Sequence, residues 1–137
     1  WQAPEATAAA TTPDGYLLTG DIGIKHADGR VQIIDRKKDM ILVSGFNVYP
    51  AEIDAVFAGH PDVAECAAVG IPDKEGSEII KLFVVPSEPD IDVEALQAWA
   101  RERLTGYKRP RDIVVVDSLP KNTVGKTLRR MLREQYA

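Results

Sequence analysis

The order of apolar segments after Pro50 constrains the fold of this chain more than any other feature. Apolar side chains at helical spacing alternate there with short apolar runs that have the length of strands. The predicted strands are Glu65–Ile71, Ile79–Val85 and Ile113–Val116. With three helices they follow the order helix, strand, strand, helix, strand, helix. This order predicts a small α+β domain, in which a three-stranded mixed sheet is flanked by helices.

Each of the three helices has a start signal. Pro50 can occupy the first position of a helix, and Glu52 then lies near the positive end of the helix dipole. Gly59 is a plausible stop for this helix. Asp92 can cap a second helix, whose apolar positions are Val93, Leu96, Ala100 and Leu104. The last helix should start at Gly125 or Lys126 and turn inward Leu128, Met131 and Leu132.

Three segments precede this pattern. Residues 1–13 are rich in Ala and Thr, which predicts a leader or linker. Ile22–Lys25 and Val31–Asp35 flank Asp28-Gly29, and an Asp-Gly turn between two strands predicts a β-hairpin. Met40–Val43 is a short apolar strand that ends at Ser44-Gly45. The hairpin has no obvious place in the α+β domain that follows it.

Composition restricts the class of protein. A chain of 137 residues has room for one compact domain, and 45% hydrophobic with 28% charged residues is typical of a folded protein. No apolar run approaches the ~20 residues of a membrane span, and the first residues lack the features of a signal peptide. The single cysteine, Cys66, excludes an internal disulfide and a cysteine-cluster metal site. We therefore expect no metal site in this chain, and a cytoplasmic location.

The net charge of −4 is unevenly distributed. Residues 1–100 carry 7 Lys and Arg against 17 Asp and Glu, whereas residues 101–137 carry 10 against 4. A basic last third indicates either a local anion site, for instance for a polyphosphate, or a solvated basic helix face. A free-standing module that binds anions or nucleic acid through residues 101–137 is one functional hypothesis, although the acidic body argues against nucleic acid.

Four motifs carry more specific information. Thr19-Gly20-Asp21 is either a turn or a carboxylate placed to accept hydrogen bonds from ribose hydroxyls. The charged run Asp35–Asp39 is either a solvated connection or a mobile joint. Ser44-Gly45-Phe46-Asn47 either turns the chain or lets a ligand pass close to the backbone. Tyr107-Lys108-Arg109-Pro110-Arg111 is suited to stacking a purine and binding its phosphates, or to packing at a rim.

The segment Lys121–Thr127 contains Gly-Lys-Thr, which ends a phosphate-binding P-loop. That motif needs a glycine where this chain has Pro120, so a P-loop is rejected. The remaining interpretation is a flexible loop that carries Lys126 beside a helix N-terminus. Such a lysine can stabilise negative charge that grows on a phosphate or carboxylate in a transition state.

Taken together and in this order, these motifs resemble the adenylate-forming enzymes, which include acyl-CoA synthetases, firefly luciferase and the adenylation domains of peptide synthetases. The matching segments are Tyr16–Asp21, Asp35–Ile53, Leu104–Pro110 and Leu119–Arg130. The resemblance covers residues 14–137 and is strongest to bacterial long-chain fatty acid–CoA ligases.

The resemblance implies roles for individual residues. Asp21 and Arg36 would bind ATP and AMP at the ribose, Lys38 would be the hinge, and Lys126 would be the catalytic lysine of adenylation. The residues expected to bind CoA are Ser44, Gly45, Phe46, Tyr107, Arg109 and Arg111. The family couples two reactions, adenylation of a carboxylate by ATP with Mg²⁺ and thioester formation with CoA, through a large rotation of its C-terminal domain.

The resemblance also implies that most of the enzyme lies outside this chain. Residues 1–37 would be the tail of a large N-terminal domain, and residues 38–137 the mobile C-terminal domain, inactive by itself. Without the large domain, we expect Trp1, Tyr16, Leu17 and Ile22 to find another partner, a second copy included. A fatty acid is the implied substrate, and a medium-chain or aryl acid is the alternative. No nucleic-acid partner and no membrane span are expected, and peripheral membrane association stays open.

Overall fold

The core of the fold is a three-stranded sheet. In the computed structural model, which describes residues 2–74 and 76–136, its strands are β5 (Val63–Pro72), β6 (Glu78–Pro86) and β7 (Asp112–Val115). Strand β6 is central, antiparallel to β5 and parallel to β7. The predicted mixed sheet is therefore confirmed.

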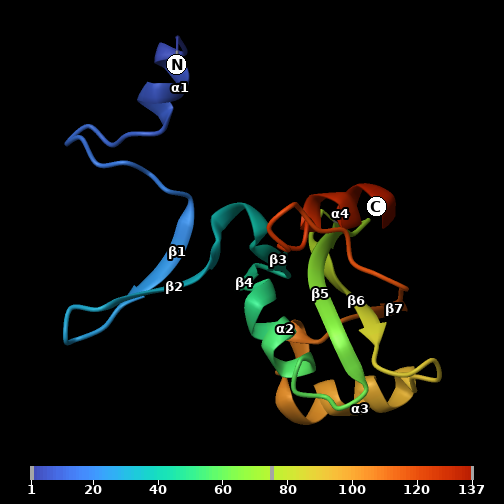
Figure 1. Cartoon of the computed structure of the whole chain (residues 1–137). Helices are drawn as coiled ribbons and strands as arrows, with labels where there is room; N and C mark the ends of the chain where they lie inside the picture. The colour runs from blue at the N-terminus through green and yellow to red at the C-terminus, as the bar shows by residue number, and fades with distance from the viewer. Residues whose placement is uncertain (1, 75, 137) are drawn as a thin grey trace. The chain divides into compact units, whose positions relative to one another are not determined.

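Helices cover both faces of this sheet (Figure 1). On one face, α2 (Pro50–Phe57) and α3 (Val93–Arg103) enclose a core that includes Ile53, Phe57, Leu82, Leu96 and Ala100. On the other face, Leu132 of α4 (Arg129–Tyr136) packs over Ala67, Val69 and Phe83. Because successive residues of a strand point to opposite faces, a sheet covered on both faces needs the near-continuous apolar runs seen here.

The first two of these helices begin where the sequence predicts. Pro50 is the first residue of α2, with Glu52 in the first turn. Asp92 caps α3, because its Oδ1 accepts hydrogen bonds from the amides of Glu94 and Ala95 at 2.9 and 3.1 Å. Helix α2 ends at Phe57, two residues before Gly59.

The prediction for the last helix is wrong at its start. Helix α4 begins at Arg129 rather than at Gly125 or Lys126, because Gly125 has φ +81° and turns the chain back on itself. Leu132 is buried as predicted, whereas Met131 is 46% exposed and faces away from the core. Lys126 consequently lies in the loop before α4, and Thr127 and Leu128 separate it from the first residue of the helix.

A small hairpin follows the charged run, which contains a 3₁₀ turn at Lys37–Asp39. Strand β3 (Ile41–Val43) pairs with β4 (Phe46–Val48), a strand that the sequence analysis missed. The connecting residues Ser44 and Gly45 both have positive φ, +48° and +84°. Two residues with positive φ form the tight turn whose twist matches a hairpin.

The chain divides into two units, one ending at Lys38 and the other beginning at Asp39. The first unit contains a hairpin of β1 (Asp21–Lys25) and β2 (Val31–Arg36), close to the predicted strands. It also contains α1 (Pro4–Ala9), in the stretch predicted to be a leader or linker. Alanines after a proline at the first helical position favour this short helix. Trp1 lies outside the described residues.

Candidate functional site

The two residues expected to bind ribose contact each other in the first unit. Asp21 and Arg36 are paired across β1 and β2, and Arg36 Nε lies 2.9 Å from Asp21 Oδ1. The amide of Lys37 donates to the carbonyl of Gly20 at 2.8 Å and extends this pairing by one residue. Thr19, Gly20, Arg36, Lys37 and Lys38 line a surface hollow beside the pair. A carboxylate held by a guanidinium is oriented to accept hydrogen bonds from hydroxyl groups.

The Ser44-Gly45 turn is fixed to the start of β6 by side chains. Ser77 Oγ accepts a hydrogen bond from the amide of Ser44 at 2.8 Å and donates to the carbonyl of Leu42 at 3.1 Å. Glu78 Oε2 accepts from the amide of Leu42 at 2.7 Å. Apart from the two chain neighbours of Gly45, no heavy atom in the described part of the chain lies within 4 Å of a Cβ placed on this residue. The turn is therefore rigid at its base and open at its tip.

Beside this turn lies a hollow of about 350 Å³. Phe46 and Tyr107 stack at one rim, with ring centroids 4.6 Å apart and planes 22° apart. The lining includes Ser44, Tyr107, Arg109 and Arg111. The six residues expected to bind CoA therefore lie together. Ser44, Tyr107, Arg109 and Arg111 line the hollow, Phe46 stacks on Tyr107, and Gly45 lies between Ser44 and Phe46 in the turn.

The two arginines of this hollow differ in what they can bind. Arg109 donates to the carbonyl of Leu104 at 2.9 Å and to that of Arg101 at 3.0 Å, so its guanidinium closes the end of α3. Among residues 2–74 and 76–136, the Arg111 side chain reaches only Asp73, at 3.5 Å, and it is 66% exposed. Arg111 is therefore better placed than Arg109 to bind an anion.

Lys108 lies between Tyr107 and Arg109 in sequence, and its side chain contacts α2. Its Nζ lies 2.7 Å from both carboxylate oxygens of Glu52, and this hydrogen bonding raises the pKa of Lys108. The pair ties the Tyr107 segment to the helix behind it.

Lys126 lies near the base of a surface loop, residues 121–127, opposite Asn122. Lys121 and Thr127 form an antiparallel bridge at its base, and the amide of Gly125 donates to the carbonyl of Asn122 at 3.0 Å. The backbone of Lys126 bonds to Asn122, and the residue itself is exposed. The loop is a hydrogen-bonded turn.

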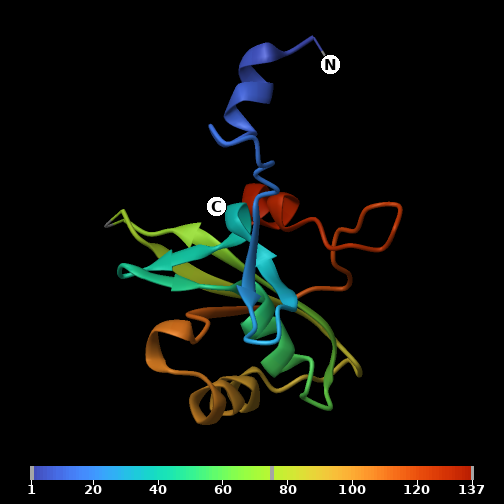
Figure 2. The same cartoon turned by 90° about the vertical axis from the view of Figure 1, so that its left-hand side faces the viewer.

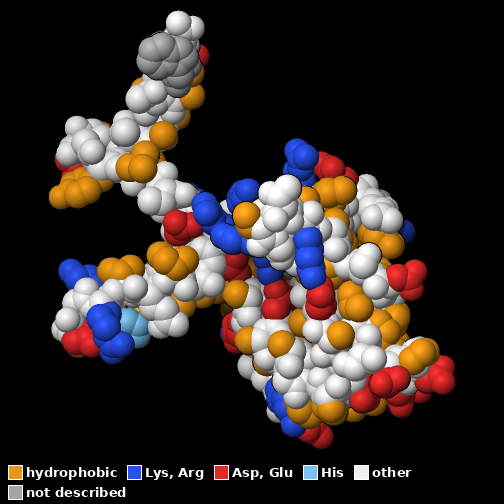
Figure 3. All heavy atoms as spheres, viewed as in Figure 1, with side chains coloured by type: hydrophobic (Ala, Val, Ile, Leu, Met, Phe, Trp, Pro, Cys, Tyr) orange, Lys and Arg blue, Asp and Glu red, His pale blue; other side chains and the backbone are white. Residues whose placement is uncertain are grey.

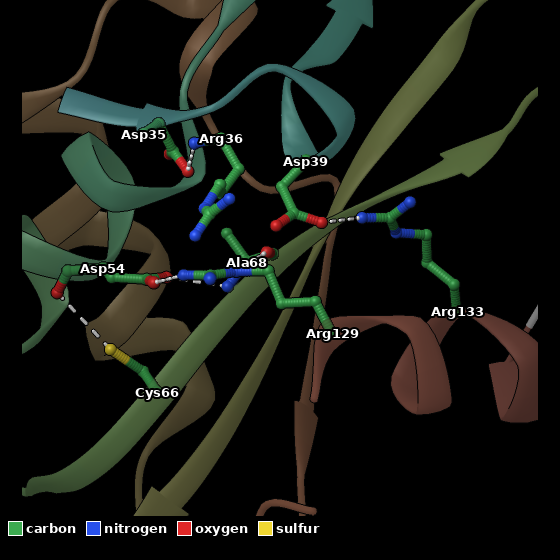
Figure 4. Close-up of polar contacts among 8 residues, drawn as sticks. All are labelled: Asp35, Arg36, Asp39, Asp54, Cys66, Ala68, Arg129 and Arg133. Atoms are coloured by element: carbon green, nitrogen blue, oxygen red, sulfur yellow. Dashed lines mark hydrogen bonds and ion pairs between the residues drawn. The ribbon is translucent and has the colours of Figure 1, made fainter. Parts of the chain in front are cut away.

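An ion-pair network attaches the segment after this loop to the sheet and to α2 (Figure 4). Arg129 Nη2 lies 2.5 Å from Asp54 Oδ2, and Arg129 Nε donates to the carbonyl of Ala68 at 3.3 Å. Asp54 Oδ1 accepts from the amide of Ala68 at 2.7 Å. Cys66 donates to the carbonyl of Asp54, and its burial, together with the Asp54 charge, raises the pKa of the thiol to about 12. Cys66 is thus a packed thiol and no nucleophile.

A second ion pair anchors the start of the second unit. Arg133 Nη2 lies 2.5 Å from Asp39 Oδ1, and the Asp39 side chain is 15% exposed. Asp39 is thereby fixed to α4, whereas Lys38 before it is exposed.

The basic last third is matched by acidic partners. At least seven of its ten Lys and Arg residues lie within 3.5 Å of a carboxylate oxygen of a described residue. Five of those carboxylates belong to the acidic body: Asp39, Glu52, Asp54, Glu65 and Asp73. The charge asymmetry of the sequence is therefore used largely to hold the C-terminal elements on the sheet.

The β3–β4 turn and the 121–127 loop project from opposite sides of the second unit (Figure 2). The sequence identified Lys126 and the Ser44-Gly45 turn but missed the residues that hold them. Asn122 had a detectable signal, because Asn three residues before Gly is typical of a turn. Ser77 had none, because it reaches a backbone amide 33 residues away.

Two further observations apply to residues 2–74 and 76–136. No three His, Cys, Asp or Glu side chains gather there in a way that could hold a metal ion. Within the same residues, no helix combines the length and apolarity that crossing a membrane requires.

Comparison with known proteins identifies relatives of the whole chain. The family described as AMP-binding enzyme C-terminal domain matches residues 52–126. A protein named long-chain-fatty-acid--CoA ligase from Escherichia coli O6:H1 is 50% identical over 135 residues, which are 98% of this chain and 24% of that protein. The chain therefore spans about a quarter of the length of this relative.

Solved structures show the same backbone. ATP-bound MatB from Rhodopseudomonas palustris aligns over 99% of this chain and 27% of its own, with a TM-score of 0.94 and 36% identity. Apo MatB aligns over the same shares with a TM-score of 0.74. One protein thus gives two scores, so the matching segment of MatB differs in conformation between its two structures.

Proposed function

Because this chain belongs to the family of AMP-binding enzyme C-terminal domains, we propose that it is the C-terminal lobe of an ATP-dependent, AMP-forming acid–CoA ligase. The 50% identity to the long-chain-fatty-acid--CoA ligase of E. coli favours long-chain fatty acids as the substrate class. The observation that carries the proposal is that the 121–127 loop, which contains Lys126, and the β3–β4 turn project from opposite sides of the second unit (Figure 2).

The Lys126 face serves the first half-reaction. A carboxylate oxygen attacks the α-phosphorus of ATP, and the bond to pyrophosphate breaks, which leaves an acyl-adenylate. Negative charge shifts between the carboxylate and the phosphate oxygens in this step. An exposed lysine on a structured loop brings a fixed positive charge to that point, an effect commonly worth about 3 kcal/mol of barrier.

The turn face serves the second half-reaction. The CoA sulfur attacks the acyl carbonyl carbon, the bond to AMP breaks, and the thiol proton leaves to solvent. The open tip at Gly45 leaves room for a thin chain beside the backbone. The hollow with Tyr107 and Arg111 offers an aromatic face and a cation for the nucleotide end of CoA.

We place the hinge between these reactions at Lys38. Lys38 is exposed, and it directly precedes Asp39, which Arg133 fixes to α4. The two TM-scores of MatB support a segment that changes conformation between states. Rotation at this joint would present one face and then the other to the same reaction centre.

We assign the first unit, residues 2–38, to the edge of a large N-terminal domain that this chain lacks. Its apolar side chains are uncovered, and Figure 3 shows hydrophobic atoms on the surface of the hairpin. Tyr16, Leu17, Leu18, Ile24, Val31 and Ile33 are each more than half exposed. An isolated two-stranded hairpin is marginal in water, so these groups need a partner. The ribose pair of Asp21 and Arg36 would then border the nucleotide.

This assignment determines the partners and cofactors. ATP, CoA and a fatty acid are substrates of the complete ligase in the cytoplasm, and Mg²⁺ would be held outside the described residues, which lack a suitable carboxylate cluster. The isolated chain should be inactive and should self-associate through its uncovered hairpin.

A chimera tests the proposal. This chain replaces the matching segment of the E. coli ligase, and CoA thioester formation from a long-chain fatty acid is measured. The chimera should be active, and the E. coli ligase without the segment, this chain alone, and the chimera with Lys126→Ala should each be inactive. A soluble, folded chimera without activity, or one unaffected by Lys126→Ala, would contradict the proposed function.

A further inference from the structure

The 121–127 loop has an unusual internal hydrogen-bond pattern. Its two backbone bonds run from Gly125 to Asn122, at 3.0 Å, and from Asn122 to the carbonyl of Lys126, at 2.9 Å. They close a four-residue turn in which Gly125 has φ +81°. A turn of this length at the surface has little apolar packing to hold it, and Val124 in its centre is 74% exposed.

The Asn122 side chain supplies the missing constraint. Its Oδ1 accepts hydrogen bonds from the amide of Lys126 at 2.8 Å and from the amide of Val124 at 3.1 Å. Asn122 therefore bonds to the Lys126 backbone on both sides of the Lys126 Cα atom. The Lys126 amide donates to Asn122 Oδ1, and the Lys126 carbonyl accepts from the Asn122 amide. These bonds set the direction in which the Lys126 side chain leaves the backbone.

We propose that Asn122 is a positioning residue for Lys126. The Asn122 side chain orients Lys126 for adenylation through the hydrogen bonds that it accepts from the backbone amides of Val124 and Lys126. The inference rests on the proposed role of Lys126 and extends it to a residue that contacts no substrate. A charge helps a reaction only when it is held at the right place, and a misplacement of about 1 Å can cost about 100-fold in rate.

The base of the loop does not depend on this side chain. Lys121 Nζ lies 2.6 Å from Glu65 Oε1, and Arg129 pairs with Asp54 on the other side. Leu119, just before the loop, is buried under α4. Removing the Asn122 carboxamide should therefore loosen the tip and leave the domain folded.

The first measurement concerns the loop itself and needs no substrate. Amide hydrogen exchange is followed in this chain for Asn122→Ala, Asn122→Asp and the neighbouring control Thr123→Ala. The aspartate keeps an oxygen acceptor in the same position, and the alanine does not. The Lys126 amide should exchange several-fold faster in Asn122→Ala alone. Equal exchange in all three variants would overturn the inference.

The second measurement tests action through Lys126 in the full-length protein. Asn122→Ala should lower kcat for acyl-adenylate formation by about 10- to 100-fold, with the KM for ATP nearly unchanged. Asn122→Asp should restore most of the rate, and Asn122→Ala should add nothing in a Lys126→Ala background. A further loss in that background would mean that Asn122 acts elsewhere and would overturn the inference. A Lys126→Ala variant with normal adenylation would instead refute the proposed function.

Discussion

Replacing Asp54 by asparagine removes the charge that holds Arg129 to α2 while it leaves the shape of the side chain. In the folded chain this carboxylate accepts from Arg129 and from the amide of Ala68, and both charged side chains are only 21% exposed. A hydrogen bond to a charged group contributes roughly 1.5–3 kcal/mol, and a half-buried guanidinium without its carboxylate adds to the loss. We expect Asp54→Asn to lower the free energy of unfolding of the second unit by about 2 kcal/mol.

A matched control separates burial from contact distance. Glu65 and Lys121 lie 2.6 Å apart, as close as the first pair, but their side chains are 41% and 39% exposed. Solvent-exposed pairs typically contribute about 0.2–1 kcal/mol, so Glu65→Gln should cost less than about 1 kcal/mol.

Thermal unfolding of residues 39–137 followed by circular dichroism measures both variants. For a domain of this size, 1 kcal/mol corresponds to a shift in Tm of roughly 4–8 °C, so Asp54→Asn should melt about 8–16 °C lower. Glu65→Gln should melt within about 8 °C of the unmodified chain. Equal shifts for the two variants would refute the argument that burial makes the Asp54–Arg129 pair structural.

Three other predictions follow from the contacts of individual residues. In the full-length protein, Arg111→Met should raise the KM for CoA with little loss of stability, whereas Arg109→Met should mainly lower Tm, because only Arg109 bonds to the carbonyls that end α3. Ser77→Ala removes the hydroxyl that accepts from Ser44, so it should slow thioester formation from supplied acyl-adenylate more than it slows adenylation. The pKa of the Cys66 thiol is raised from 9.0 to about 12 by folding, so the unfolded chain loses this proton first as pH increases. Cys66 should therefore stabilise the fold up to about pH 9 and progressively less between pH 9 and pH 12, in urea titrations that compare the chain with Cys66→Ala.

The sequence predicted the sheet because each strand is a compact apolar run and each of the first two helices has a local start signal. Asp92 illustrates this, since its cap is made to the next two or three residues. The predicted start of α4 was wrong because a basic segment with few apolar residues does not reveal where the turn at Gly125 ends and the helix begins. Strand β4 was missed because it is three residues long and its stability comes from pairing with β3.

The sequence names candidate site residues, but it does not reveal the contacts that hold them. Lys126, Gly45 and Tyr107 stand in motifs that resemble a known family. Asn122 lies four residues from Lys126, but the supports of the other two are far away in sequence, as with Ser77 on Ser44 or Glu52 on Lys108, and such pairs depend on tertiary packing. The surplus of positive charge in the last third suggested either an anion site or a solvated helix face, whereas at least five of its ten Lys and Arg residues pair with carboxylates of residues 1–100.

The central claim is that two faces of one small domain serve two half-reactions, and comparing Lys126→Ala with Gly45→Asn in the full-length protein tests it most directly. Asparagine tolerates the positive φ of Gly45 and adds bulk at the open tip of the turn. Single-turnover rates are measured for acyl-adenylate formation and for thioester formation from supplied acyl-adenylate. Lys126→Ala should slow only the first by about 100-fold or more, and Gly45→Asn should slow only the second. Both variants slowing the same half-reaction would contradict the account.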